Sequence, residues 1–299
     1  MKTLSPPILR PGDRIGVVAP AGPPRRRALE AGIAVLEKRG FEVVRGRHLF
    51  DRQGYLAGTD ADRLADLNGM LRDPRARAVW FARGGYGLHR IIRGVDFAAL
   101  RRAPKALIGY SDLTVLQAAA WRRLGLGGFQ GPMVAELADP RAYHPGSLWR
   151  ALAGERIRVR FGRSSVVRPG RAAGPLVGGC LSLLTALVGT PYEPPLDGAI
   201  LFWEEVNEEP FRIDRMLAHL KLAGRLDRLA GMVVGSLPGC RPRRRANAMP
   251  LAAILATHLA GTDYPVVTGI PAGHGPGKIT LPVGFPARID TRSGVLSVR

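Results

Sequence analysis

The chain has 299 residues, of which 46% are hydrophobic and 23% are charged, proportions that are typical of a globular protein with a substantial core. No apolar run approaches the length of a membrane-spanning helix, so we expect no membrane partner. The net charge of +20 would attract polyanions, but the arginines are scattered and no aromatic residues alternate with them, which argues against a nucleic-acid surface.

The first half of the chain alternates short apolar runs with helical patterns. Because these apolar runs are continuous, each strand is expected to be covered on both faces, as in a parallel α/β sheet. In such sheets, functional loops follow the carboxyl ends of the strands. The predicted strands span 13–20, 41–44, 78–82 and 105–109, and the predicted helices span 26–39 and 60–71.

The pattern weakens between residues 138 and 171, where prolines interrupt it and residues 156–168 alternate basic with apolar side chains. We interpret 138–171 as a connection that carries an edge strand. It separates an N-terminal domain, 1–137, from a second α/β domain, 172–299. Elements predicted in the second domain are helices up to 188 and at 211–223 and 248–260, and strands at 200–203, at 232–234 and around Val266, Ile279 and Ile289.

Ser111 lies where the predicted strand 105–109 ends and a helical pattern begins. A serine on such a turn is exposed beside the unpaired N–H groups of the next helix, which is the geometry that a nucleophile needs. A serine followed by Asp112 is also an ordinary helix N-cap. Both interpretations of Ser111 remain open on this segment alone.

A serine nucleophile needs a base, and His274 is the histidine best placed to serve as one. It lies in a loop rich in Gly and Pro, residues 269–277, where no packing pattern requires an imidazole. A loop histidine without function is the alternative. The other five histidines are less suitable. Three of them lie near no carboxylate motif, namely His48, His89 and His144, and two lie within predicted helices, namely His219 and His258.

The acid that would orient such a base is sought in the acidic run that follows strand 200–203. Glu204 comes directly after the apolar residues, whereas strand alternation points Glu205 to the opposite face. The alternative is a solvated loop whose negative charge stabilises the next helix.

The glycine-rich turn 83–87 follows another predicted strand. It lacks the Lys and Ser/Thr of a phosphate-binding loop, and its spacing is not that of a dinucleotide fingerprint. It could instead give a backbone N–H to an oxyanion hole beside Ser111, with Arg83 binding a substrate carboxylate. The two cysteines, Cys180 and Cys240, form neither a disulfide framework nor a metal motif, and we expect no metal site. Free thiols and the absence of a signal-peptide pattern predict a cytoplasmic protein.

Seven motifs, each weak alone, occur in an order that resembles the LD-carboxypeptidases, a family of serine peptidases whose type activity is muramoyltetrapeptide carboxypeptidase. The motifs are GDRIGVVAP at 12–20, ARGGYG at 82–87, IGYSDLT at 108–114, GPM at 131–133, GGCLS at 178–182, WEE at 203–205 with RIDRML at 212–217, and GH at 273–274.

The resemblance implies roles for particular residues. Ser111 would be the nucleophile, His274 the base and Glu204 the acid that orients it. The N–H groups of Gly85 and Asp112 would form the oxyanion hole. Apart from the resemblance, we expect Arg83 and Tyr110 to contact substrate. The chain departs from the family pattern at two positions. Glu205 replaces a more usual Asp, and Cys180 stands where Asn is common.

The resemblance also implies a fold and a reaction. The expected fold is a flavodoxin-like or glutamine-amidotransferase-like N-terminal lobe and a swivelling β/α-type C-terminal lobe, with the triad assembled across their interface, often in a homodimer. The expected reaction, which needs no cofactor, releases D-alanine from murein tetrapeptide during peptidoglycan recycling.

Three alternatives remain. A sister activity of the family resembles the microcin C self-immunity enzymes, which cleave aminoacyl-nucleotide conjugates. An α/β-hydrolase also orders its triad Ser, acid, His, but expects Gly where this chain has Leu113. A non-enzymatic basic protein that binds polyanions is the third.

Overall fold

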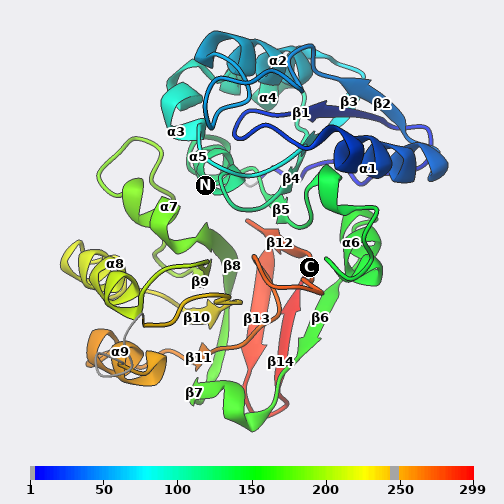
Figure 1. The fold of residues 1–299 in the computed structure, drawn as a ribbon. Helices are drawn as coiled ribbons and strands as arrows, with labels where there is room; N and C mark the ends of the chain where they lie inside the picture. Colours follow the sequence, from blue (N-terminus) through cyan, green and yellow to red (C-terminus); the bar gives the residue numbers. More distant parts are fainter. Residues whose placement is uncertain (1–3, 243–248) are drawn as a thin grey trace.

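The computed structural model describes residues 4–242 and 249–299. Two sheets form two lobes, which lie one above the other in Figure 1. The first sheet has the strand order β12-β5-β4-β3-β1-β2. Its members are β1 (Arg14–Val18), β2 (Glu42–Arg45), β3 (Ala76–Phe81), β4 (Ala106–Gly109), β5 (Gly128–Gln130) and β12 (Leu281–Val283).

Strands β1 to β5 run parallel, as the continuous apolar runs predict, and helices cover both faces. Neighbouring residues show this alternation, since Val17 packs in the cluster that contains α1 side chains and Val18 in the cluster that contains α2 side chains. The helices of this lobe are α1 (Arg26–Lys38), α2 (Asp60–Arg72), α3 (Leu88–Ile91), α4 (Phe97–Arg102) and α5 (Leu113–Leu124), with short 3-10 turns η1 (Ile92–Gly94) and η2 (Val134–Glu136).

The second sheet is mixed and has the order β6-β14-β13-β8-β9-β10-β11-β7. Strands β8 to β11 are parallel, and antiparallel strands flank them. The strands are β6 (Ile157–Arg160), β7 (Val166–Arg168), β8 (Arg171–Cys180), β9 (Ile200–Glu204), β10 (Gly231–Val234), β11 (Val266–Val267), β13 (Pro286–Asp290) and β14 (Val295–Val298). The helices are α6 (Pro145–Leu152), α7 (Leu181–Ala186), α8 (Pro210–Leu222) and α9 (Leu251–His258), with η3 (Arg163–Ser165).

The two-lobed α/β architecture confirms the predicted fold, and the connection 138–171 does carry an edge strand. It supplies both edges of the second sheet, β6 and β7, together with α6. The short strand predicted around Ile279 is present but begins two residues later, at Leu281. The preceding residue, Thr280, donates its N–H to Ser147 Oγ at 3.0 Å rather than to a strand. The helix predicted from 248 begins at Leu251, and residue 248 lies outside the described residues.

Strand β12 joins the lobes, because a segment from the last part of the chain pairs antiparallel with β5 of the first sheet. One apolar cluster accordingly runs through both lobes and includes Trp80, Phe202 and Leu281. The described residues include no helix with the length and apolar character needed to cross a bilayer.

We predict that Leu281→Ala lowers the free energy of unfolding by about 2–5 kcal/mol, because it leaves a cavity where the lobes share a core. Chemical denaturation followed by circular dichroism measures this loss. Leu222→Ala is the control, since Leu222 is 89% exposed, and we expect its effect to stay within about 0.5 kcal/mol. Equal effects of the two substitutions would contradict a shared core.

Candidate active site

Ser111 lies on the turn between β4 and α5, where its backbone φ is 58°. This left-handed conformation is uncommon for a residue with a side chain, and it is typical of functional turns that expose a nucleophile. The turn also lies close to the glycine-rich turn after β3. A Cβ on Gly84 would lie 2.9 Å from Ser111 Cβ and 3.0 Å from its Oγ, so only glycine permits this approach.

The residues that follow Gly84 and Ser111 in the chain carry the two backbone donors expected to form the oxyanion hole. Within the described residues, the N–H groups of Gly85 and Asp112 donate to no protein acceptor. The Asp112 side chain links their two turns, because its buried carboxylate accepts a hydrogen bond from the Leu88 N–H at 2.8 Å. Burial raises the pKa of Asp112 to about 6, against the opposing effects of this hydrogen bond and of Arg63. The serine turn and the glycine turn are therefore held together by one side chain.

Glu204 and His274 form a hydrogen-bonded pair in the second lobe. Glu204 ends β9 and has no exposed surface, and its Oε2 lies 2.7 Å from His274 Nδ1. The same oxygen accepts the backbone N–H of His274 at 3.1 Å. With Nδ1 directed at a carboxylate, the imidazole carries its proton there and leaves Nε2 free to act as a base.

Close approach of the His274 loop to this carboxylate requires a glycine. A Cβ on Gly273, whose φ is 101°, would lie 2.4 Å from Glu204 Oε2. The other carboxylate oxygen, Oε1, is buried and has no hydrogen-bond partner among the described residues. Within the described residues, the hydrogen bonds to this carboxylate therefore come from His274 alone.

Glu205 points the other way, as strand alternation predicts. It accepts hydrogen bonds from the N–H groups of Ser182 at 2.8 Å and Val206 at 2.9 Å, and it lies against Cys180. Both glutamates are buried, so the solvated-loop interpretation of Glu204 and Glu205 is wrong. Glu205 stabilises the start of α7 and is unavailable to His274.

The two halves of the site meet at the boundary between the lobes. The ring of Tyr110, the residue before Ser111, lies edge-on to the His274 ring with the centroids 4.8 Å apart. In this structure no hydrogen bond joins Ser111 Oγ to His274 within the described residues. The structure therefore pairs the acid with the histidine and brings that histidine against the serine turn.

The two residues expected to contact substrate differ in their availability. Arg83 is exposed, and one guanidinium nitrogen is anchored on the Pro23 carbonyl at 3.0 Å. The Tyr110 hydroxyl donates to Glu136 at 2.9 Å, so it already has a partner inside the protein. Burial and the nearby Glu136 carboxylate raise the pKa of this phenol well above its usual range.

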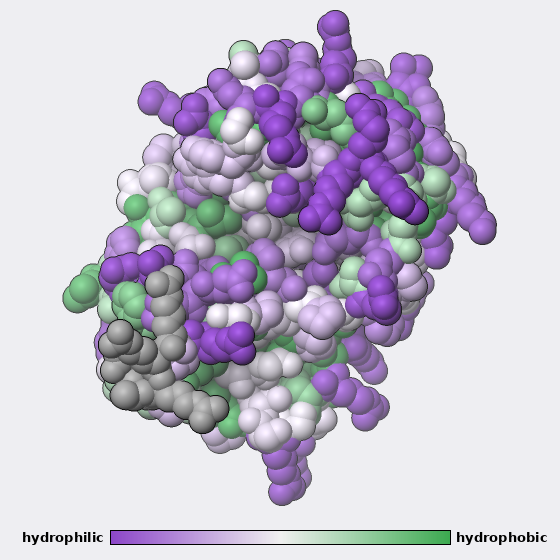
Figure 2. Space-filling model, viewed as in Figure 1, coloured by the Kyte–Doolittle hydropathy of each residue, from purple (hydrophilic) through white to green (hydrophobic). Residues whose placement is uncertain are grey.

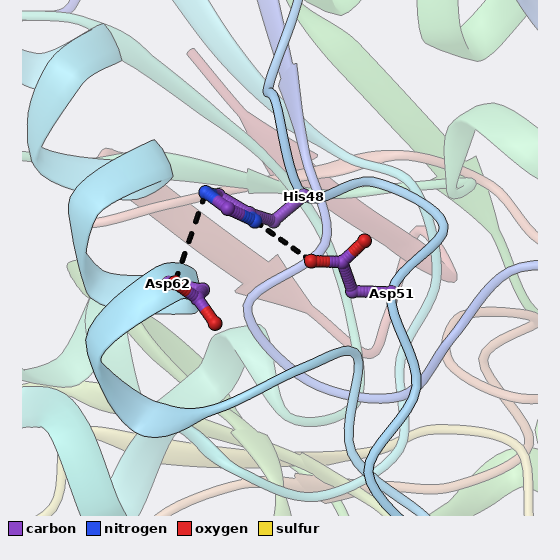
Figure 3. Close-up of side chains that lie close together, drawn as sticks. All are labelled: His48, Asp51 and Asp62. Carbon is purple, nitrogen blue, oxygen red and sulfur yellow. Dashed lines mark hydrogen bonds and ion pairs between the residues drawn. The ribbon is translucent and has the colours of Figure 1, made fainter.

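The structure also gathers a group that the sequence did not indicate, since His48 lies between two carboxylates (Figure 3). Its Nδ1 is 2.7 Å from Asp51, and its Nε2 is 3.8 Å from Asp62. Because each ring nitrogen faces its own carboxylate, the arrangement suits a protonated imidazole better than three ligands around one cation. The signal available in the sequence was the spacing of three between His48 and Asp51.

We predict that His48 stabilises the fold more at low pH than at high pH. The hydrogen bond to Asp51, assisted by Asp66 and Asp62, raises the pKa of His48. The stabilisation is therefore complete below the unfolded-state pKa of about 6.5 and is lost as the pH rises through the folded-state value. Unfolding free energies of wild type and His48→Gln should differ more at about pH 5 than at about pH 9. A difference that grows with pH would contradict this.

Models of known families match both lobes. Residues 15–131 match the LD-carboxypeptidase N-terminal domain, and residues 173–289 match the LD-carboxypeptidase C-terminal domain. Together these matches cover most of the chain and both halves of the site.

Two similar proteins are named as carboxypeptidases of murein peptides. The chain is 39% identical to a probable murein peptide carboxypeptidase of Bacillus subtilis, over 96% of this chain and 91% of that one. The crystal structure of muramoyltetrapeptide carboxypeptidase from Oxalobacter formigenes superposes with a TM-score of 0.86 at 30% identity, covering 95% of this chain and 97% of that one.

A second type of relative has the same fold. The microcin C7 self-immunity protein MccF of Escherichia coli is 26% identical over 96% of this chain and 93% of its own length. Its wild-type structure superposes with a TM-score of 0.88 at 23% identity, covering 99% of this chain and 98% of that one. At that identity the superposition supports the fold alone.

Proposed function

The chain belongs to the LD-carboxypeptidase family, and we propose that it is a serine peptidase that releases the C-terminal D-alanine of murein tetrapeptide. The observation that carries the proposal is the Glu204–His274 pair at the lobe boundary, where His274 meets the turn that carries Ser111. The names of the relatives support the substrate class.

In the proposed reaction, Ser111 Oγ attacks the carbonyl carbon of the bond between the L-centre and D-alanine, and His274 Nε2 takes the hydroxyl proton. The imidazolium that forms is stabilised by the buried Glu204 carboxylate. His274 then gives its proton to the leaving amine, so that D-alanine departs and an acyl-enzyme remains. Water, deprotonated by His274, hydrolyses the ester and regenerates the serine.

The negative charge that develops on the carbonyl oxygen would be bound by the N–H groups of Gly85 and Asp112. Donors placed before the reaction need no reorganisation as the charge forms, and the loss of one such donor typically costs about 10²–10³-fold in kcat. The Asp112 carboxylate contributes by holding the two turns in register.

The basic surface suits a substrate that ends in a carboxylate. Figure 2 shows hydrophilic side chains over much of the visible face, and the apolar patches between them are small. Arg25 and Arg83 are exposed in the loops after β1 and β3, at the carboxyl edge of the first sheet. We propose that Arg83 binds the terminal carboxylate and that the net charge of +20 draws the anionic peptide in. No specific nucleic acid is part of the proposal.

We further propose that the enzyme acts in the cytoplasm as a homodimer and contributes to the recycling of cell-wall peptides. Sedimentation equilibrium tests the oligomeric state. A monomer at all accessible concentrations would remove that part of the proposal and leave the chemistry intact.

The second candidate is hydrolysis of aminoacyl-nucleotide conjugates, as the similarity to the self-immunity protein suggests. The two candidates share the triad and differ in the group that leaves. Incubating the protein with murein tetrapeptide, murein pentapeptide and an aminoacyl-adenylate analogue, followed by mass spectrometry, separates them. Release of D-alanine from the tetrapeptide supports the first candidate, and cleavage of the adenylate alone supports the second.

We predict that Ser111→Ala and His274→Ala each lower kcat on murein tetrapeptide by about 10⁴-fold or more, because neither retains the nucleophile–base relay. D-alanine release coupled to an oxidase assay measures this. Near wild-type turnover by Ser111→Ala would refute the proposed nucleophile.

We predict a smaller loss for Glu204→Gln, about 10²- to 10⁴-fold in kcat, with KM little changed. The carboxamide can present its NH₂ group to Nδ1 and so favour the tautomer that cannot accept the serine proton. Glu205→Gln is the matched control, since Glu205 contacts backbone N–H groups and not His274. Equal losses in the two variants would contradict the assignment of Glu204.

A further inference from the structure

Three polar side chains from both lobes meet beside the candidate site. Glu136 Oε1, on η2 of the first lobe, accepts hydrogen bonds from the Tyr110 hydroxyl and from Lys278 Nζ, each at 2.9 Å. Lys278 comes from the loop between β11 and β12, and its side chain is only 4% exposed. A buried lysine and a half-buried glutamate thus form an ion pair between the loop that carries His274 and the first lobe.

Further hydrogen bonds hold both members of this ion pair. Lys278 Nζ also donates to the Ala142 carbonyl at 2.9 Å, and Glu136 Oε2 accepts the Met133 N–H at 2.8 Å. Removing a charge from water is costly unless hydrogen bonds replace the lost hydration, and the buried lysine has two such acceptors. Each added hydrogen bond restricts the geometry of the network.

Tyr110 connects this network to both Ser111 and His274. Tyr110 precedes Ser111 in the chain, and its ring edge contacts the imidazole of His274. Lys278 follows His274 by four residues in the loop between β11 and β12, and its Nζ lies 5.0 Å from the centroid of the Tyr110 ring. The Tyr110 ring therefore lies close to both the lysine and the histidine of one loop, while its hydroxyl is fixed on Glu136 of the first lobe.

The far end of the same loop is held by the connection between the lobes. The Gly277 N–H donates to the Arg141 carbonyl at 2.8 Å, and the Lys278 carbonyl accepts the His144 N–H at 2.8 Å. Glu204 fixes the imidazole within the second lobe alone. The position of His274 relative to Ser111 must be set by contacts that cross between the lobes, and the Tyr110–Glu136–Lys278 network is such a contact.

We propose that Tyr110, Glu136 and Lys278 are positioning residues that hold the imidazole of His274 against the Ser111 turn. The inference rests on the proposed function for the roles of Ser111 and His274. It assigns Tyr110 to alignment of the base and removes it from the substrate contacts. Misplacement of a catalytic group by about 1 Å can cost 10²-fold in rate, so loss of this network should act on kcat.

The test compares a half-buried tyrosine, Tyr110, with a buried one, Tyr143. Tyr110→Phe removes the hydroxyl that binds Glu136 and keeps the ring against His274. Tyr143→Phe is the matched control, because Tyr143 is 4% exposed and its hydroxyl donates to the Leu137 carbonyl at 3.2 Å rather than to Glu136. We expect Tyr110→Phe to lower kcat about tenfold at unchanged KM, and Tyr143→Phe to leave kcat within about twofold.

A second readout does not depend on the peptide substrate. The rate at which a fluorophosphonate labels Ser111 reports how well the base is aligned, and it should fall in parallel with kcat in Tyr110→Phe. Lys278→Met, which leaves Glu136 without its cation, should lower both rates further, whereas Lys278→Arg should recover part of them.

Several outcomes would overturn the proposal. A raised KM at unchanged kcat in Tyr110→Phe would show that the hydroxyl serves substrate binding. Equal losses of kcat in the Tyr110→Phe and Tyr143→Phe variants would show that the network has only a structural role. If wild type labels readily at Ser111 but does not cleave murein tetrapeptide, the proposed substrate fails, and the labelling rates still decide whether the network aligns the base.

Discussion

Glu204 is a carboxylate without exposed surface, and its contact with His274 is the interaction on which the rest of the site depends. A buried charge is tolerated only when hydrogen bonds compensate for lost water, and here one oxygen receives both the ring and the backbone N–H of the same residue. Gly273 permits that double contact because it has no Cβ. Because β9 ends at this carboxylate, the fold of the second lobe fixes the position of the His274 imidazole.

Much of this arrangement could be predicted from local patterns, for physical reasons that particular residues illustrate. Continuous apolar runs define the parallel strands of the first sheet, and glycine-rich turns after them mark its carboxyl edge. Ser111, Glu204 and His274 were recognisable because each interrupts an apolar or glycine-rich pattern with a reactive group. Alternation along a strand also separated Glu204 from Glu205, and the buried contacts of Glu205 explain why it serves the start of α7 instead.

Interactions between segments distant in the chain could not be predicted in this way. The strand expected around Ile279 begins instead at Leu281, because hydrogen bonds from a segment more than 130 residues away fix the residues before it. The Tyr110 hydroxyl could be assigned only after η2 and the loop of Lys278 were placed together. His48 likewise acquires Asp62 through the packing of α2. These are tertiary contacts that leave no periodic signal in the sequence.

The position of β12 has a consequence for synthesis of the chain on the ribosome. The first sheet takes an edge strand from residues 281–283, although its other strands end by residue 130. Domains that fold during translation do so as their own strands emerge, but this sheet is not complete until a strand more than 150 residues after β5 has been made. The nascent N-terminal lobe therefore exposes the edge of β5 until residues 281–283 have emerged, and a premature stop before β12 would leave that edge open to pairing with another chain.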